Sequence, residues 1–254
     1  MHPVITIDQG NTRTKTHLML EGRVLADYSG PTPSLEIVLA MQERWGQTGA
    51  IYRSVGCMDV RFIESLRHLT EKPVRVLTHA TPLPVRIDYA TPQTLGTDRI
   101  VAAVGALKLL GEGVPALVVD AGTCITLDIL DASATFRGGN ISPGIRMRLD
   151  AMHRFTDRLP EVTTAGDTPL FGYDTVTALR AGAIRGIAGE VKATLLAARA
   201  RYGVQTLVLS GGDMQTLIPF ISEDLNDYND LRIFPAADLI PVGLEEIYRY
   251  NENL

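Results

Sequence analysis

The sequence has few cysteines, no long apolar run and no obvious export signal, and each shortage excludes a class of protein. Its two cysteines, Cys57 and Cys124, form no Cys-x-x-Cys pair and give no disulfide framework. The apolar runs are far shorter than the roughly 18 residues of a membrane-spanning helix. Met1-His2-Pro3 lacks a basic region followed by a longer apolar one, so we expect no signal peptide. We expect a reduced, cytoplasmic protein in which Cys124 is a buried, unreactive thiol.

Basic clusters and metal-ligand spacings are also missing. The net charge is -5 and no run of Lys or Arg occurs, so nucleic acid is not an expected partner. The five histidines are scattered without the spacing of metal ligands. The 254 residues are 45% hydrophobic, which is enough for one large core or for two smaller ones.

Periodicity predicts an α/β chain. Predicted strands cover 4–8, 14–20, 23–28, 50–55, 73–77, 116–120, 124–130, 134–139 and 206–210. Predicted helices cover 35–45, 60–69, 100–110, 144–157, 174–201, a segment after Asp213 and a segment after Pro241. Residues 81–93 contain three prolines and are expected to form a loop with extended pieces. Strands precede helices on both sides of the glycine-rich segment 111–115, which favours two α/β lobes with mixed sheets, residues 1–114 and 115–254.

Two similar turns follow apolar strands, 112 positions apart. The first is Asp8-Gln9-Gly10-Asn11-Thr12, and the second is Asp120-Ala121-Gly122-Thr123. Glycine lets the backbone approach a ligand closely, and the turn amides and hydroxyls can donate to phosphate. The carboxylates suit Mg²⁺ or another cation, and Arg13 and Lys15 add positive charge. A simple turn capped by its own aspartate is the alternative for either copy alone, whereas the pair favours a duplicated phosphate site.

A third carboxylate, Asp98, lies in Leu95-Gly96-Thr97-Asp98-Arg99 at the start of a predicted helix. It could complement the helix dipole there. It could equally be a general base for a substrate hydroxyl, with Arg99 binding an anionic group of that substrate. The residues alone leave both interpretations open.

Several motifs occur in a fixed order along the chain: Asp8–Arg13, Gly96–Arg99, Asp120–Thr123, Gly138–Gly144, Ser210–Asp213 and Asp238–Leu244. Together they resemble those of the type III pantothenate kinases, and the resemblance covers nearly the whole chain. It implies an actin-like ATPase fold, with two ribonuclease-H-like lobes and a nucleotide cleft between them. It also implies ATP-dependent phosphorylation of pantothenate to 4'-phosphopantothenate, the first step of coenzyme A biosynthesis. Mg²⁺, a monovalent cation (K⁺ or NH₄⁺) and a homodimer with substrate sites near its interface are implied as well.

The resemblance also assigns roles to residues. ATP is expected at Asp8, Gln9, Gly10, Asn11, Thr12, Arg13, Thr14, Lys15 and Thr123, and pantothenate at Tyr89, Gly96, Thr97, Asp98, Arg99 and Thr175. Asp98 is then the proton acceptor, and Asp120 binds the monovalent cation. Asp8 serves Mg²⁺ through phosphates or water. Cys124 and Ser210 depart from the alanine and threonine usual in the family, and neither change removes a charge that the mechanism needs.

Two other functions are compatible with the same fold. One is another small-molecule kinase or a phosphatase, but Gly96–Arg99 with Tyr89 speaks against a sugar kinase. The other is a non-catalytic ATP-binding accessory protein. An inactive relative is disfavoured by the presence of four residues that the mechanism uses: Asp8, Asp98, Arg99 and Asp120.

Overall fold

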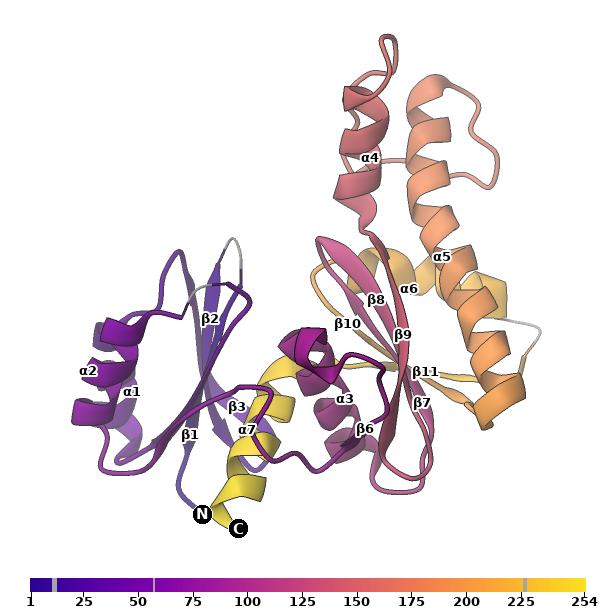
Figure 1. The fold of residues 1–254 in the computed structure, drawn as a ribbon. Coiled ribbons are helices and arrows are strands. Elements are labelled where there is room, and N and C mark those ends of the chain that lie inside the picture. The colour runs from indigo at the N-terminus through magenta and orange to yellow at the C-terminus, as the bar shows by residue number, and fades with distance from the viewer. Residues whose placement is uncertain (11–12, 57, 226–227) are drawn as a thin grey trace. The chain divides into compact units, whose positions relative to one another are not determined.

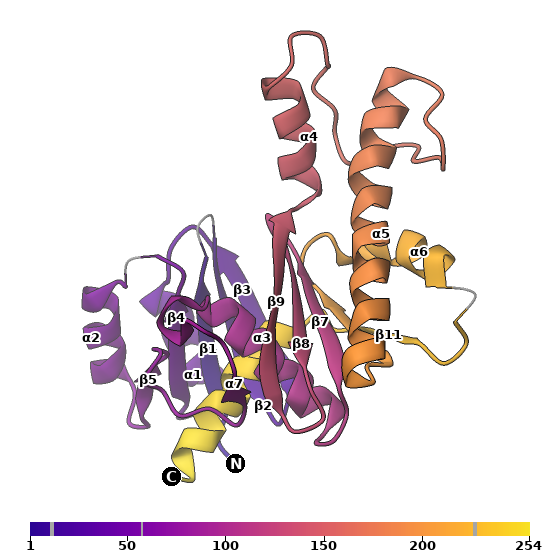
Figure 2. The same ribbon diagram turned by 45° about the vertical axis from the view of Figure 1, so that its right-hand side comes forward.

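A computed structural model describes residues 1–10, 13–56, 58–225 and 228–254 (Figures 1 and 2). The chain divides into two compact units. The first contains Met1–Gly111 and Asp238–Leu254, and the second contains Glu112–Ala237. The boundary between Gly111 and Glu112 lies within the glycine-rich segment 111–115. The sequence pattern predicts that residues 238–254 belong to the second lobe, but in the structure this segment is part of the first unit.

The first unit is built on a mixed five-stranded sheet in the order β3-β2-β1-β4-β5. The strands are β1 (Val4–Gln9), β2 (Thr14–Leu20), β3 (Arg23–Gly30), β4 (Gly49–Ser54) and β5 (Val74–Val76). Helices α1 (Leu35–Trp45) and α2 (Val60–Leu69) bury apolar side chains against the core residues of β1, β2 and β4. Residues 81–93, predicted to be a loop with extended pieces, contain one short strand, β6 (Arg86–Ile87), and a 3₁₀ turn that was not predicted, η1 (Pro92–Thr94), begins at their end.

Helices α3 (Thr97–Leu110) and α7 (Leu239–Glu252) pack closely on each other in the same unit. Two glycines allow this approach. A Cβ on Gly105 would lie 2.3 Å from the Leu239 carbonyl oxygen, and one on Gly243 would lie 2.1 Å from that of Val101. The sequence predicted a start after Pro241 for the last helix. The helix begins earlier because N–H groups in the first turn need no intrahelical partner, so proline fits there.

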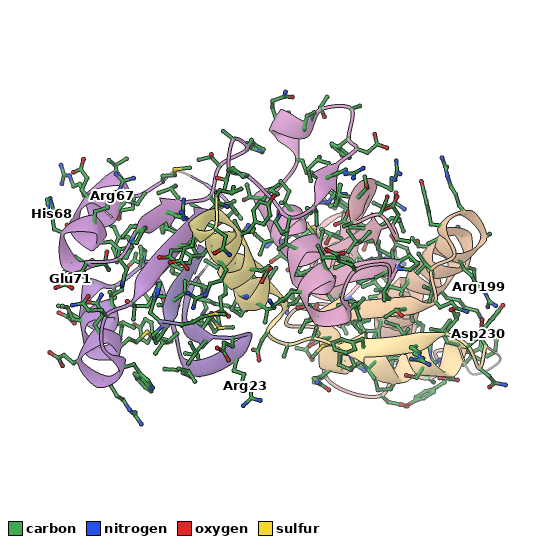
Figure 3. The ribbon with its side chains drawn as sticks, turned by 90° about the horizontal axis from the view of Figure 1, so that it is seen from below. Arg23, Arg67, His68, Glu71, Arg199 and Asp230 are labelled. Atoms are coloured by element: carbon green, nitrogen blue, oxygen red, sulfur yellow. The ribbon has the colours of Figure 1, made fainter. Side chains whose placement is uncertain are left out.

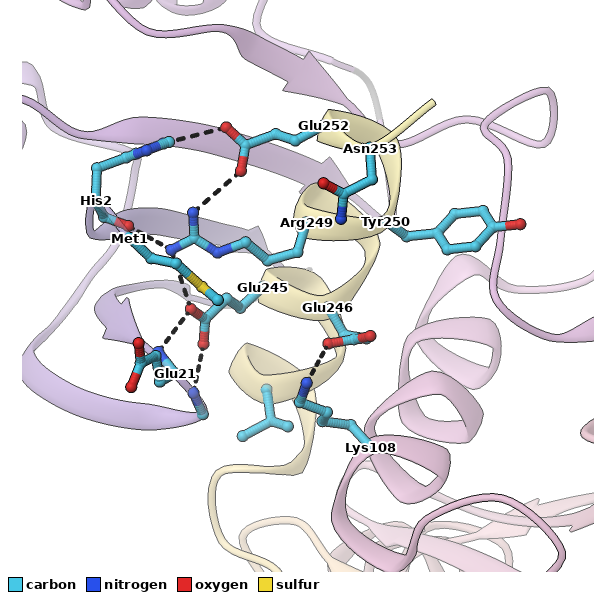
Figure 4. A pocket seen from close by; sticks show the side chains of 12 residues that line it. Met1, His2, Glu21, Lys108, Glu245, Glu246, Arg249, Tyr250, Glu252 and Asn253 are labelled. Carbon is cyan, nitrogen blue, oxygen red and sulfur yellow. Dashed lines mark hydrogen bonds and ion pairs between the residues drawn. The ribbon is translucent and has the colours of Figure 1, made fainter.

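Helix α7 also contacts β1, β2 and β4 and holds the β2–β3 turn. The Glu245 carboxylate is buried and accepts hydrogen bonds from the amides of Glu21 (3.0 Å) and Gly22 (2.8 Å). Figure 4 shows this turn beside a pocket of about 700 Å³ lined by α7, α3 and the amino-terminal residues. The pocket adjoins the start of β1, whereas Asp8 lies near the end of that strand, so it is separate from the predicted phosphate turn.

The second unit repeats the strand order of the first. Its strands are β7 (Ala116–Ala121), β8 (Cys124–Leu130), β9 (Thr135–Pro143), β10 (Thr206–Ser210) and β11 (Arg232–Pro235). They run in the order β9-β8-β7-β10-β11, with β7 antiparallel to β8 and parallel to β10. In the first unit β1 is likewise antiparallel to β2 and parallel to β4. The two predicted phosphate turns therefore occupy equivalent places, at the ends of the central strands β1 and β7.

Three helices complete the second unit: α4 (Ile145–Arg154), α5 (Thr175–Tyr202) and α6 (Met214–Leu225). Apolar residues of α5 and α6 cover β7, β8 and β10 in the core of this unit. Helix α4 and the amino-terminal part of α5 extend beyond the sheet in both views (Figures 1 and 2). Among the described residues, no helix is both long and apolar enough to cross a membrane.

Candidate functional site

The first phosphate turn lies between β1 and β2. The Gly10 amide donates to the Arg13 carbonyl at 2.9 Å, which closes the turn. Arg13 and Lys15 are exposed, whereas the Thr14 side chain is buried and its hydroxyl has no hydrogen-bond partner among the described residues. The charged side chains of Arg13 and Lys15 are therefore open to solvent, whereas the Thr14 hydroxyl is inside the protein. The predicted ATP residues Asn11 and Thr12 lie outside the described residues.

Neighbouring side chains of β4 hold the two turn residues Asp8 and Gln9. Arg53 pairs in register with Asp8 on the parallel strands, so both side chains lie on one face of the sheet. The Arg53 Nε donates to Asp8 Oδ1 at 2.9 Å, and Nη2 contacts the same oxygen. On the other face, the Tyr52 hydroxyl donates to Gln9 Oε1. The Asp8 carboxylate is thus paired with a guanidinium that is only 4% exposed.

Arg53 also reaches the predicted substrate segment, although it belongs to none of the sequence motifs. Its Nη1 lies 3.5 Å from the hydroxyl of Thr97, the first residue of α3. The signal in the sequence that points to Arg53 is a charged residue within the apolar strand predicted at 50–55. The parallel pairing of β1 with β4, which gives that charge its partner, is a long-range contact that local patterns do not reveal.

Asp98 lies in the first turn of α3, directly after Thr97. Its carboxylate lies over Gly96, as a hypothetical Cβ shows: placed on Gly96, it would be 2.3 Å from Asp98 Oδ1. Glycine at this position leaves the space that the carboxylate occupies. The carboxylate is at a helix amino-terminus, where backbone N–H groups and the helix dipole favour negative charge.

Arg99 and Tyr89, two further predicted substrate residues, lie together. The Arg99 guanidinium is 5.7 Å from the centre of the Tyr89 ring, within the range of a cation–π contact. Arg99 is largely buried and Tyr89 is half-buried. The first unit therefore brings Asp8, Thr97 and Asp98 into one connected region and places Arg99 against Tyr89.

The second phosphate turn is closed by its own Gly122 and held by Gly144, which follows β9. The Gly122 amide donates to the Cys124 carbonyl, and the Gly144 amide donates to the Thr123 carbonyl, both at 3.0 Å. A Cβ on Gly144 would lie 2.1 Å from the Gly122 carbonyl oxygen. Thr123 is exposed, as an ATP contact would require. The prediction that Cys124 is buried is wrong: it begins β8 beside this turn and is exposed.

Asp213 is a carboxylate that belongs to the motif Ser210–Asp213 but not to the predicted site. Its amide donates to the Ala121 carbonyl at 2.9 Å, next to Asp120. Gly211 has φ +95° and leaves no room for a Cβ, which would lie 2.2 Å from the Ala121 carbonyl oxygen. Burial raises the pKa of the Asp213 carboxyl, and a hydrogen bond from the Ile145 backbone partly opposes this shift. Two aspartates, Asp120 and Asp213, therefore lie at the second turn.

The predicted substrate residue Thr175 is exposed at the first position of α5. Asp174 caps the helix there by accepting from the Thr177 amide at 2.7 Å, and the Thr177 hydroxyl bonds back to the Asp174 amide. Thr175 belongs to the second unit, while Tyr89 and Gly96–Arg99 belong to the first. Neither unit contains the whole predicted substrate set.

Metal ligands are sparse in both turns. The described part of the chain has no group of three or more His, Cys, Asp and Glu side chains that could hold an ion. Mg²⁺ in phosphoryl-transfer sites commonly uses one or two carboxylates together with phosphates and waters. One carboxylate at the first turn, and Asp120 with Asp213 at the second, fit that kind of site better than an all-protein metal cage.

A family model described as type III pantothenate kinase matches residues 4–197 of the chain. The type III pantothenate kinase of Phocaeicola vulgatus is 37% identical over 98% of this chain and 99% of its own length. That of Bacteroides fragilis is also 37% identical, over 97% of this chain and 98% of its own.

Solved structures agree on the fold. A conserved Baf family transcriptional activator from Campylobacter jejuni superposes with a TM-score of 0.62 at 23% identity, over 98% of this chain and 100% of the other. The activator of 2-hydroxyisocaproyl-CoA dehydratase from Clostridium difficile, with bound ADPNP, gives a TM-score of 0.53 at 12% identity, over 99% and 98%. These likenesses show the fold alone, and they confirm the predicted actin-like ATPase fold.

Proposed function

Since the chain belongs to the type III pantothenate kinase family and is therefore a phosphotransferase, we propose that it phosphorylates pantothenate to 4'-phosphopantothenate with ATP. The observation that carries this proposal is the arrangement in the first unit. Arg53 contacts Asp8 and Thr97, and so joins a glycine turn flanked by exposed Arg and Lys side chains to the helix start that carries Asp98. Phosphoryl transfer needs alignment, charge neutralisation and a proton acceptor, and these residues offer all three.

Asp98 is the proposed proton acceptor. The alcohol oxygen of pantothenate attacks the γ-phosphorus of ATP, the bond from that phosphorus to the ADP oxygen breaks, and Asp98 takes the hydroxyl proton. Because the pKa of a primary alcohol is very high, this proton moves late in the reaction and the acceptor needs only to be well placed. Arg99, held against Tyr89, supplies a guanidinium for a carboxylate or carbonyl oxygen of pantothenate.

The turn at Asp8 is the proposed ATP-phosphate site. Its amides, with Arg13 and Lys15, would donate to phosphate oxygens, and Asp8 would orient Mg²⁺ through water or the phosphates. Bound Mg²⁺ would neutralise phosphate charge. In the second unit, Asp120 is the proposed ligand of K⁺ or NH₄⁺ and exposed Thr123 a contact to ATP.

A homodimer is proposed from the surface around Thr175. Large apolar side chains are exposed on the part of the second unit that extends beyond its sheet: Phe155 (87%), Leu170 (63%), Phe171 (83%) and Tyr173 (72%). Exposed apolar clusters of this kind usually mark an interaction surface. A second copy of the chain is the proposed occupant, and it would bury the segment in which Thr175 lies.

The test is ATP-dependent formation of 4'-phosphopantothenate by the purified protein, with and without K⁺ or NH₄⁺. We expect turnover with the cation present, and Asp98→Asn to reduce kcat by about 100-fold or more while nucleotide binding persists. Wild-type protein that binds ATP but phosphorylates no pantothenate would favour the accessory-protein alternative. Phosphorylation of another alcohol instead would favour a different kinase of this fold.

A further inference from the structure

Arg53 joins the two halves of the candidate site within the first unit. Its Nε and Nη2 contact the Asp8 carboxylate, and its Nη1 lies 3.5 Å from the Thr97 hydroxyl. We propose that Arg53 is a positioning residue that couples the phosphate turn at Asp8 to the substrate segment at Thr97–Asp98. The inference rests on the proposed function, because it takes Asp8 as part of the nucleotide site and Asp98 as the proton acceptor.

The sheet fixes where Arg53 stands. Asp8 and Arg53 are register partners on β1 and β4, so the two side chains project from the same face of adjacent parallel strands. With only 4% of its surface exposed, the guanidinium has little freedom to adopt another rotamer. A buried charge of this kind persists where it is paired and hydrogen-bonded, and Asp8 supplies that pairing.

The shape of the guanidinium suits a bridge. Its planar fork presents Nε and Nη2 to one carboxylate and leaves Nη1 to donate in another direction, here toward Thr97. A lysine ammonium would keep the charge but could not hold both contacts in one fixed plane. The functional value of Arg53 is therefore expected to lie in its geometry as well as in its charge.

A change in the position of Asp8 can be transmitted to Thr97 through the two contacts of Arg53. A phosphate bound at the turn would fix Asp8, Asp8 fixes Arg53, and Arg53 holds Thr97, which directly precedes Asp98. Misplacement of a reacting group by about 1 Å can cost about 100-fold in rate. A loss of the bridge should therefore appear mainly in kcat rather than in the KM for either substrate.

Four variants test the bridge: Arg53→Gln, Arg53→Lys, Thr97→Val and the double variant Arg53→Gln/Thr97→Val. Arg67→Gln is the matched control, because Arg67 is exposed on α2 and points away from the fold (Figure 3). Thr97→Val removes the hydroxyl that Arg53 contacts and leaves the Arg53–Asp8 pair intact, so it provides a variant without an unpaired buried charge. Thermal melts establish that each variant is folded.

We expect Arg53→Gln to lower kcat by about 30-fold or more, with KM changes below about threefold, and Arg53→Lys to recover only part of that loss. Thr97→Val should lower kcat severalfold. The double variant should be no worse than Arg53→Gln, because both changes remove one shared contact. Folded Arg53 and Thr97 variants with wild-type kcat, or effects that multiply in the double variant, would overturn the proposal.

Hydrogen–deuterium exchange gives a readout that does not depend on the acceptor substrate. A non-hydrolysable ATP analogue with Mg²⁺ should slow exchange in peptides covering residues 95–100 of the wild type and of Arg67→Gln. The same analogue, bound to saturation, should leave these peptides unprotected in Arg53→Gln and Thr97→Val. Equal protection in wild type and variants would refute the coupling, even if pantothenate proved not to be the substrate. If the wild type phosphorylates pantothenate and the variants do so equally well, the role of Arg53 would be refuted while the proposed function would stand.

Discussion

At the scale of single residues, Gly96 is the position where the addition of one methyl group is expected to lower activity most. Its backbone lies in a region open to any residue, so alanine fits the conformation. The added Cβ would collide with Asp98 Oδ1, which can rotate away at little cost. We predict that Gly96→Ala keeps its melting temperature within a few degrees but lowers kcat about 10- to 100-fold, as measured by calorimetry and steady-state kinetics.

Gly189→Ala is the matched control for this substitution. Gly189 lies on the exposed side of α5, and a Cβ there would meet no described residue within 4 Å beyond the local backbone of its own helix. Alanine should leave kcat unchanged and raise stability by up to about 1 kcal/mol, since it favours the helix. A Gly96→Ala enzyme that matched Gly189→Ala in kcat would show that the position of Asp98 is unimportant.

The charge of Asp120 is the second residue-scale test. Asp120→Asn keeps the size of the side chain but weakens it as a ligand for a monovalent cation. We predict that the stimulation of activity by K⁺ is reduced at least several-fold, measured as initial rate against KCl at constant ionic strength. Asp27→Asn makes the same change of net charge on an exposed strand residue and should retain the full response. An unchanged K⁺ curve for Asp120→Asn would exclude the assignment.

At the scale of elements, Asp131 organises the turn from β8 to β9. Oδ1 accepts from the Ser133 and Thr135 amides at 2.9 and 3.0 Å, and Oδ2 accepts from Arg137 Nε at 2.6 Å. Burial alone would raise the pKa of Asp131, but hydrogen bonds from Arg137, Ser133 and Thr135 outweigh it and hold the pKa below its usual value. The carboxylate form is therefore the one that stabilises the folded turn.

The lowered pKa sets the direction of the pH dependence. The stabilisation by Asp131 is present above its pKa in the unfolded chain and is lost as pH falls through the lower folded value. We predict that Asp131→Asn costs about 1–3 kcal/mol near neutral pH and that this difference shrinks below about pH 4. Urea unfolding across that range measures it. A difference that is constant with pH would mean that the charge plays no part.

Local patterns predicted most elements but not their long-range partners. Strands with uninterrupted apolar runs, such as β1 and β7, and long helices such as α5 were predicted within a few residues. The short strand β11 was missed, because four residues with little apolar alternation carry too weak a signal. The site residues near the turns followed from motifs, whereas Arg53 depends on the pairing of β1 with β4. Tertiary contacts of that kind leave no periodic trace in the sequence.

At the scale of the whole molecule, the exposed apolar segment near Thr175 predicts self-association. Phe171→Glu puts a charge where the proposed partner copy would bury a ring that is now 83% exposed. We expect a dimer for the wild type and a monomer for Phe171→Glu by sedimentation equilibrium. Val60→Glu, an equivalent change at an exposed position on α2, should remain dimeric. A wild-type monomer, or a dimer that tolerates Phe171→Glu, would contradict the proposed interface.

The discontinuity of the first unit has a consequence for protein synthesis. Residues Met1–Gly111 leave the ribosome before the whole second unit, whereas α7, which completes the first unit, follows it. At about 5–20 residues per second, the nascent first unit waits on the order of ten seconds for that helix. The second unit, continuous in sequence, can fold in the meantime. A chain whose synthesis ends before α7 would therefore have a folded second unit and an incomplete first unit. The incomplete unit is the one that carries Asp8, Arg53 and Asp98.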